Sequence, residues 1–207
     1  MVDVWCDVVC PFCYLGSRQL DLAIAAFDHG GEVVVRHHAF ELDPRSPARY
    51  DQPLDELVAE RYDMPVEKVR AFHSRLEARA EELGMTWSFE SAQPANTFDA
   101  HRLVALAATQ GLAGEMSERL FRAYFSEGLL PSDRAQLSVL AGEVGVADAE
   151  LLWATNAFAC DVRADETSAD QLDITGVPAV LVNNRFMILG AQGVEPMLDV
   201  LQRAWAS

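Results

Sequence analysis

A chain of 207 residues and 22.8 kDa is long enough to bury a large hydrophobic core. Half of its residues are hydrophobic and 23% are charged, which excludes an intrinsically disordered chain. The formal net charge of −16 argues against nucleic acids and anionic membrane surfaces as partners.

The amino end lacks the features of a secretory signal. Asp3 stands where a signal peptide carries positive charge, and no uncharged apolar run is long enough to span a bilayer. We therefore expect a cytoplasmic protein whose thiols rest mostly reduced, with no membrane partner.

The first 53 residues alternate between strand and helix patterns. An apolar run over residues 2–9 predicts a buried strand, and a cysteine pair follows it directly. Apolar residues at helical spacing then predict a helix that stops at His29-Gly30-Gly31. A second strand fits residues 32–40, and the prolines of residues 42–53 indicate a loop.

Residues 54–158 show helical patterns and no strand signal. Phe72 belongs to one apolar stripe and is expected in the core, and Ser132 is expected to cap the helix that follows Pro131. We therefore predict an all-helical domain over 54–158, inserted into an α/β unit formed by residues 1–53 and 159–207.

Strand patterns return near the carboxyl end. Residues 179–182 and 185–189 flank Asn183-Asn184, and asparagine tolerates the positive φ of a tight hairpin turn. An amphipathic pattern from Val194 to Trp205 predicts a closing helix. The order of strands and helices predicts a mixed α/β fold.

Cys10 and Cys13 have the spacing of a redox-active thiol pair at the start of a helix. Unpaired backbone N–H groups and the helix dipole favour the thiolate form of Cys10. Cys13 lies one turn further on, where it can attack a mixed disulfide formed on Cys10. Pro11 suits the first helical turn, since its missing N–H costs nothing there.

A structural zinc site is the alternative use of such a pair, but it requires four ligands. The sequence has no second pair at short spacing, and the side chains of His37 and His38 would point to opposite faces of a strand. We therefore expect no metal.

Three other residues have open roles. Cys6 is expected to be a small buried residue, and Cys160 could pair with it only if the fold brought the two together. His101 could line the groove facing Cys10, lie exposed, or cap a helix.

Four segments stand out in chain order. They are residues 7–16 around the cysteine pair, residues 40–44 (Phe-Glu-Leu-Asp-Pro), residues 96–102 (Asn-Thr-Phe-Asp-Ala-His-Arg), and Gly176-Val177-Pro178 with Gly190-Ala191-Gln192 after it. Their order and spacing resemble the FrnE-type branch of the DsbA family of thiol–disulfide oxidoreductases. The resemblance implies a thioredoxin fold interrupted by a helical domain.

The resemblance also implies the remaining site residues. Pro178 would be a cis-proline beside the cysteines, and Val177 would offer its backbone to an extended substrate. Phe12 lies between the two cysteines, where periplasmic DsbA proteins carry a histidine that helps to stabilise the reduced thiolate. Because Phe12 brings neither a donor nor a positive charge, we expect a weaker oxidant than DsbA.

These observations predict a cytoplasmic thiol–disulfide oxidoreductase in which Cys10 forms mixed disulfides and Cys13 resolves them. Its expected partners are protein, peptide or small thiols and disulfides. No cofactor is expected, glutathione is a candidate co-substrate, and the chain is a monomer or a homodimer.

Two alternatives belong to other functional classes. The glutathione-dependent 2-hydroxychromene-2-carboxylate isomerases and kappa-class glutathione transferases share the interrupted fold, but typically have serine where Cys10 stands. A binding module with vestigial thiols is the third reading, and the intact cysteine pair argues against it.

Overall fold

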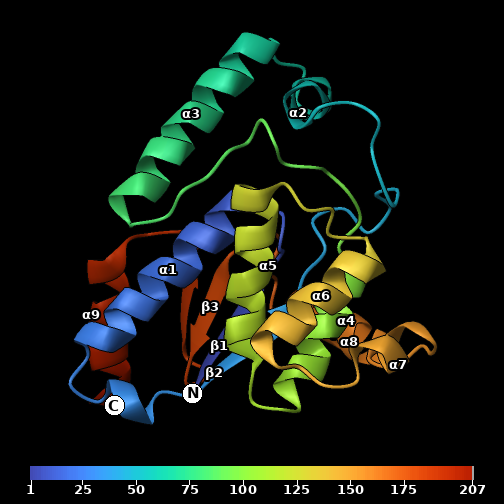
Figure 1. Ribbon diagram of the computed structural model, residues 1–207. Helices are drawn as coiled ribbons and strands as arrows, with labels where there is room; N and C mark the ends of the chain where they lie inside the picture. The colour runs from blue at the N-terminus through green and yellow to red at the C-terminus, as the bar shows by residue number, and fades with distance from the viewer. Residues whose placement is uncertain (207) are drawn as a thin grey trace.

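The computed structural model describes residues 1–206 and has a four-stranded sheet at its centre (Figure 1). The strand order is β2 (Val35–Ala39), β1 (Val2–Cys6), β3 (Ala179–Val182) and β4 (Phe186–Leu189). β1 runs parallel to β2 and antiparallel to β3, and β3 pairs antiparallel with β4. This is the sheet of a thioredoxin fold, and it confirms the predicted α/β class.

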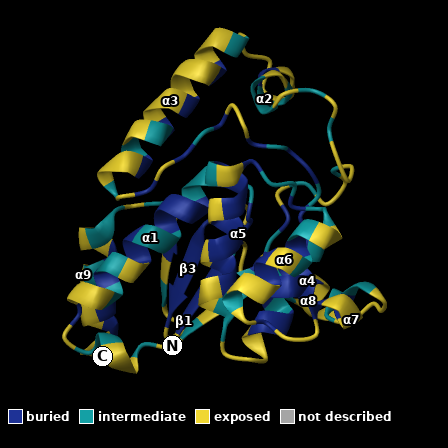
Figure 2. Cartoon of the chain, in the orientation of Figure 1, coloured by how far each residue is buried: buried dark blue, intermediate teal, exposed yellow. Residues whose placement is uncertain are grey.

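Side chains that alternate along the strands bring helices to both faces of the sheet. Val2 and Val4 pack in a core with α1 (Pro11–Ala26) and α9 (Val194–Trp205). Trp5 points to the opposite face, which α8 (Ala159–Gln171) covers. Figure 2 shows the result, with the central strands β1 and β3 buried and the outer faces of the helices exposed.

The described chain between β2 and α8 contains helices and no strand, as predicted. The helices are α2 (Leu54–Arg61), α3 (Val66–Glu82), α4 (Phe98–Ala108), α5 (Ala113–Glu127), α6 (Arg134–Val144) and α7 (Ala149–Trp153). α2 and α3 pack on each other at the top of Figure 1, away from the sheet.

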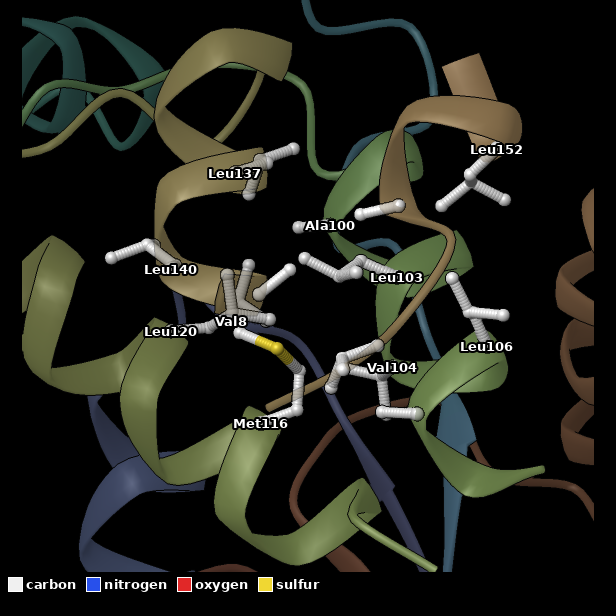
Figure 3. Packing of buried hydrophobic residues seen from close by; sticks show 14 of the residues in the cluster. Val8, Ala100, Leu103, Val104, Leu106, Met116, Leu120, Leu137, Leu140 and Leu152 are labelled. Atoms are coloured by element: carbon white, nitrogen blue, oxygen red, sulfur yellow. The ribbon is translucent and has the colours of Figure 1, made fainter. Parts of the chain in front are cut away.

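Helices α4, α5 and α6 enclose a separate apolar core, and Val8 inserts into it directly after β1 (Figure 3). α8 packs against both β2 and α4. Residues on the two sides of position 158 therefore contact each other, and the domain division at 53/54 and 158/159 stays a prediction.

Two strands are shorter than predicted. β1 ends at Cys6 rather than at residue 9, because the chain turns at Asp7, whose carbonyl accepts from the Cys10 N–H at 3.0 Å. β2 begins at Val35, since Gly30–Glu32 form a turn of 3-10 helix instead of the start of the strand. The predicted hairpin is confirmed, with φ of 51° at Asn183 and 53° at Asn184.

The predicted cap of α6 at Ser132 is wrong, because Asp133 performs that role. The Asp133 carboxylate accepts from the backbone N–H of Ala135 at 2.9 Å and of Gln136 at 3.2 Å. The Ser132 hydroxyl donates instead to the carbonyl of Ala48 in the loop after β2. A carboxylate is the stronger acceptor at a helix amino terminus.

None of the helices in residues 1–206 is long and apolar enough to cross a membrane.

Candidate functional site

The cysteine pair lies at the amino end of α1. Cys10 is the residue before the helix, in extended conformation, and Pro11 occupies the first helical position as expected. The Cys10 thiol is buried and donates to the Val177 carbonyl at 3.7 Å. The nucleophile predicted from the sequence therefore lies against the segment that carries the predicted cis-proline.

Cys13 lies behind Cys10 and is fully buried. The backbone N–H of Asp7 donates to the Cys13 sulfur at 3.4 Å. Burial raises the pKa of the Cys13 thiol well above its usual value, and the neighbouring Cys10 and Cys6 thiols raise it further. The Cys13 thiol is therefore protonated at neutral pH.

Cys6 packs against the apolar residues around the cysteine pair and against those between the sheet and α1, as expected of a small packed residue, although it is only half-buried. Cys160 is exposed at the start of α8. All four cysteines are free thiols in this structure.

Pro178 packs directly against α1. The Val177–Pro178 peptide bond is cis. Gly16 faces the proline, and a Cβ built on this glycine would lie only 2.9 Å from the Pro178 Cγ. The Pro178 carbonyl accepts from the Gly190 N–H at 2.7 Å. Residues 7–16 and Gly190-Ala191-Gln192, two of the segments that carry the family resemblance, therefore contact Pro178 and hold Val177 beside Cys10.

A buried Asp7–His101 pair lies next to the cysteines. Asp7 Oδ1 is 3.3 Å from His101 Nε2, and Asp7 Oδ2 accepts from the Leu42 N–H at 2.7 Å. His101 is buried and lines a separate cavity of about 30 Å³ rather than the groove above Cys10. It is neither exposed nor a helix cap, so none of the three roles considered for it is correct.

Glu41 fixes the next part of the same loop. This buried carboxylate accepts from Asn96 Nδ2 at 3.1 Å and pairs with Arg163 of α8 at 2.6 Å. The resembling segments at 40–44 and 96–102 thus contact each other and set the path of the loop after β2.

A groove with a volume of about 350 Å³ lies over Cys10. Its walls come from the start of α1 and the residues before it, the segment from Leu42 to Tyr62, α3, the segment from Phe89 to Thr97, α5, and Gly176-Val177. Six aromatic side chains line it: Phe12, Tyr50, Tyr62, Phe72, Phe89 and Tyr124.

The groove separates the predicted site residues into two groups. Cys10, Phe12 and Val177 line the groove, whereas Cys13 and Pro178 do not. Phe72, which we expected in the core, is 36% exposed, and its ring lies 6.3 Å from that of Phe12. Phe72 does lie in a helix, as its apolar spacing predicted. Helix periodicity cannot, however, distinguish a face toward the core from a face toward a groove.

No cluster of three or more His, Cys, Asp or Glu side chains in residues 1–206 is arranged to hold a metal ion. His37 and His38 point to different neighbours, as the strand geometry predicts. His38 stacks on Trp5 and bonds to Asp3 and Asp165, whereas His37 lies 3.4 Å from the Ser117 hydroxyl.

Residues 1–202 match the family described as DSBA-like thioredoxin domain. The crystal structure of a probable DsbA oxidoreductase from Streptomyces coelicolor superimposes with a TM-score of 0.94 at 33% identity, covering 100% of this chain and 90% of that one.

Two more distant structures share the fold. The cytosolic disulfide reductase DsbM from Pseudomonas aeruginosa with GSH has a TM-score of 0.69 at 19% identity, covering 100% of this chain and 99% of that one. A 2-hydroxychromene-2-carboxylate isomerase has a TM-score of 0.72 at 18% identity, covering 99% of this chain and 94% of that one. At these identities the likeness concerns the fold alone.

Proposed function

Because the chain belongs to the family of DSBA-like thioredoxin domains, we propose that it is a thiol–disulfide oxidoreductase that works through Cys10 and Cys13. One observation carries the proposal. Cys10 lines the groove, while Cys13 is fully buried behind it with a raised thiol pKa. A substrate entering the groove therefore meets one sulfur first and has no direct path to the other.

The reaction proceeds through a mixed disulfide. The Cys10 thiolate attacks a substrate disulfide, the S–S bond of the substrate breaks, and one substrate thiolate leaves. Cys13 then loses its proton and attacks the Cys10 sulfur, which releases the second substrate thiolate. Two electrons have passed to the substrate, and a Cys10–Cys13 disulfide remains. The reverse sequence delivers a disulfide.

Val177 and Pro178 complete the proposed site. The Val177 carbonyl accepts from the Cys10 thiol, and it loses this donor when Cys10 forms a mixed disulfide. It can then accept an N–H from an extended substrate. Phe12 offers the substrate an apolar ring beside the reacting sulfur. The cytoplasm remains the predicted compartment, whereas the lining of the groove argues against glutathione, the candidate co-substrate.

The test is to trap the mixed disulfide. In a chain with Cys160→Ser to remove the exposed thiol, the further change Cys13→Ser should accumulate adducts on Cys10 after exposure to a disulfide. The adducts are located by mass spectrometry of proteolytic fragments. The matched chain with Cys10→Ser should accumulate none at Cys13, because that sulfur is buried, and the fragment map distinguishes any adduct on the half-buried Cys6.

An insulin-reduction assay on the unaltered chain provides the second readout. Turnover together with trapped adducts supports an oxidoreductase. Absence of both, with glutathione-dependent isomerisation of 2-hydroxychromene-2-carboxylate instead, would contradict the proposal and favour the isomerase branch of the same fold.

A further inference from the structure

The groove above Cys10 holds one arginine, and that arginine is already occupied. Arg61 Nη2 lies 2.5 Å from Asp43 Oδ2, and both residues line the groove. The Asp43 carboxylate offsets the positive charge of this guanidinium, so the pair attracts a second anion less strongly than an unpaired arginine would.

The groove's other basic side chain is a histidine with an acidic partner of its own. His73 Nδ1 lies 2.6 Å from Asp55 Oδ1, and its ring stacks on Phe89 with 4.1 Å between centroids. Arg75 lies 5.9 Å above the Phe72 ring but does not line the groove. No basic side chain among the described lining residues is therefore without an acidic partner.

Asp7 is the acidic side chain of the lining that has no arginine partner, and the Asp43–Arg61 pair adds no net positive charge to offset it, so the groove does not attract a carboxylate. The chain as a whole adds to this effect with its net charge of −16. A carboxylate that enters the groove would lose its hydration without meeting an unpaired positive charge. The free energy of this desolvation is unfavourable. An uncharged aromatic or branched apolar group would instead be received by the aromatic lining.

We propose, on the basis of the function proposed above, that this groove selects small disulfides and thiols with an uncharged apolar body, and discriminates against anionic ones such as glutathione. The Asp43–Arg61 pair is the specificity-determining device, because it withholds the groove's one arginine from anions. The volume of about 350 Å³ is that of a small-ligand pocket.

The test compares two chromogenic disulfides that differ only in charge. Bis(4-nitrophenyl) disulfide is neutral, whereas 5,5′-dithiobis(2-nitrobenzoate) has the same rings with one carboxylate each. The reduced chain with Cys13→Ser and Cys160→Ser is mixed with each, and release of the coloured thiolate is followed by stopped flow. The rate measured with a matched chain that also has Cys10→Ser is subtracted from the rate for each disulfide. Each difference is then divided by the rate at which N-acetylcysteine reacts with the same disulfide.

The expected ratio of normalised rates is about tenfold or more in favour of the neutral disulfide. Asp43→Asn should raise the rate of the anionic disulfide severalfold, because Arg61 then becomes available. This gain should disappear when Arg61→Gln is added. Asp199→Asn is the matched control: it removes one negative charge from a surface pair with Arg203 on α9 and should leave the ratio unchanged.

Equal normalised rates, or oxidised glutathione reacting faster than the neutral disulfide, would overturn the inference while leaving the proposed function intact. A gain for Asp199→Asn as large as that for Asp43→Asn would show that overall charge, not the Asp43–Arg61 pair, sets the ratio. A disulfide-linked peptide with apolar neighbours reacting faster than the small disulfide would overturn the choice of a small molecule. No reaction above the Cys10→Ser background with either disulfide would overturn the proposed function itself.

Discussion

Gly16 is the position where a single added methyl group should impair both the stability of the chain and its reaction at Cys10. In Gly16→Ala, the new Cβ would lie 2.9 Å from Pro178 Cγ and 3.4 Å from Pro178 Cβ. Carbon atoms pack at roughly 3.5–4.0 Å, so the helix and the proline must move apart. Such overpacking costs about 1–3 kcal/mol. Alanine returns up to about 1 kcal/mol through its higher helix propensity.

The net expectation is a loss of about 0–2 kcal/mol in the free energy of unfolding. Gly142→Ala is the matched control, because Gly142 also lies within a helix, α6, but has no neighbour within 4 Å of its added Cβ. That substitution should stabilise the chain by about 1 kcal/mol. Urea unfolding of the two variants and the parent gives the difference between them, expected to be about 1–3 kcal/mol.

The functional readout is the rate at which Cys10 forms a mixed disulfide. Since Pro178 follows Val177 directly, a displaced proline shifts the carbonyl that contacts the Cys10 thiol. We expect a severalfold slower reaction for Gly16→Ala and an unchanged rate for Gly142→Ala. The reasoning is refuted if Gly16→Ala stabilises the chain as much as Gly142→Ala and reacts at the parent rate.

Two further predictions concern buried polar groups. Arg102 is buried and donates to the Asp99 carboxylate and to the carbonyls of Leu152, Thr155 and Ala157. Arg102→Met should therefore lower the free energy of unfolding by about 3–5 kcal/mol. A loss below about 1 kcal/mol in urea unfolding would contradict this. Burial opposes the charge of His38, but hydrogen bonds to Asp165 and Asp3 outweigh it and raise the histidine pKa above its usual value of 6.5. A raised pKa stabilises the fold at low pH and loses that effect as pH rises through the folded-state value, so stability should fall above pH 6.5, and His38→Gln should flatten the decline. An unchanged slope in the variant would refute this role.

The parts of the fold that follow from local pattern could be predicted from the sequence. The continuous apolar runs of β3 and β4, the asparagine turn between them, and Pro11 at the start of α1 each depend on neighbours within a few positions. The cysteine pair belongs to the same class, because its spacing and its helix together define its geometry.

Contacts between distant positions could not be predicted in this way. Asp7 and His101 are separated by 94 positions, and nothing local indicates that they meet. The same holds for Arg61 and Asp43, because the pairing depends on how the loop after β2 returns toward α2. Cys6 shows the same limit, since strand alternation says which face its side chain occupies but not that Cys13 is its neighbour there.

The central position of β1 has a consequence for synthesis on the ribosome. β2, the parallel partner of β1, emerges soon after β1. β3 must pair with the other edge of β1, but it begins about 140 residues after the end of β2. At typical elongation rates this delay is on the order of ten seconds. During that interval the nascent chain displays both cysteines and one open strand edge, without the Val177–Pro178 segment. Nearly the whole chain must therefore emerge from the ribosome before Val177 can lie beside Cys10 and complete the proposed redox site.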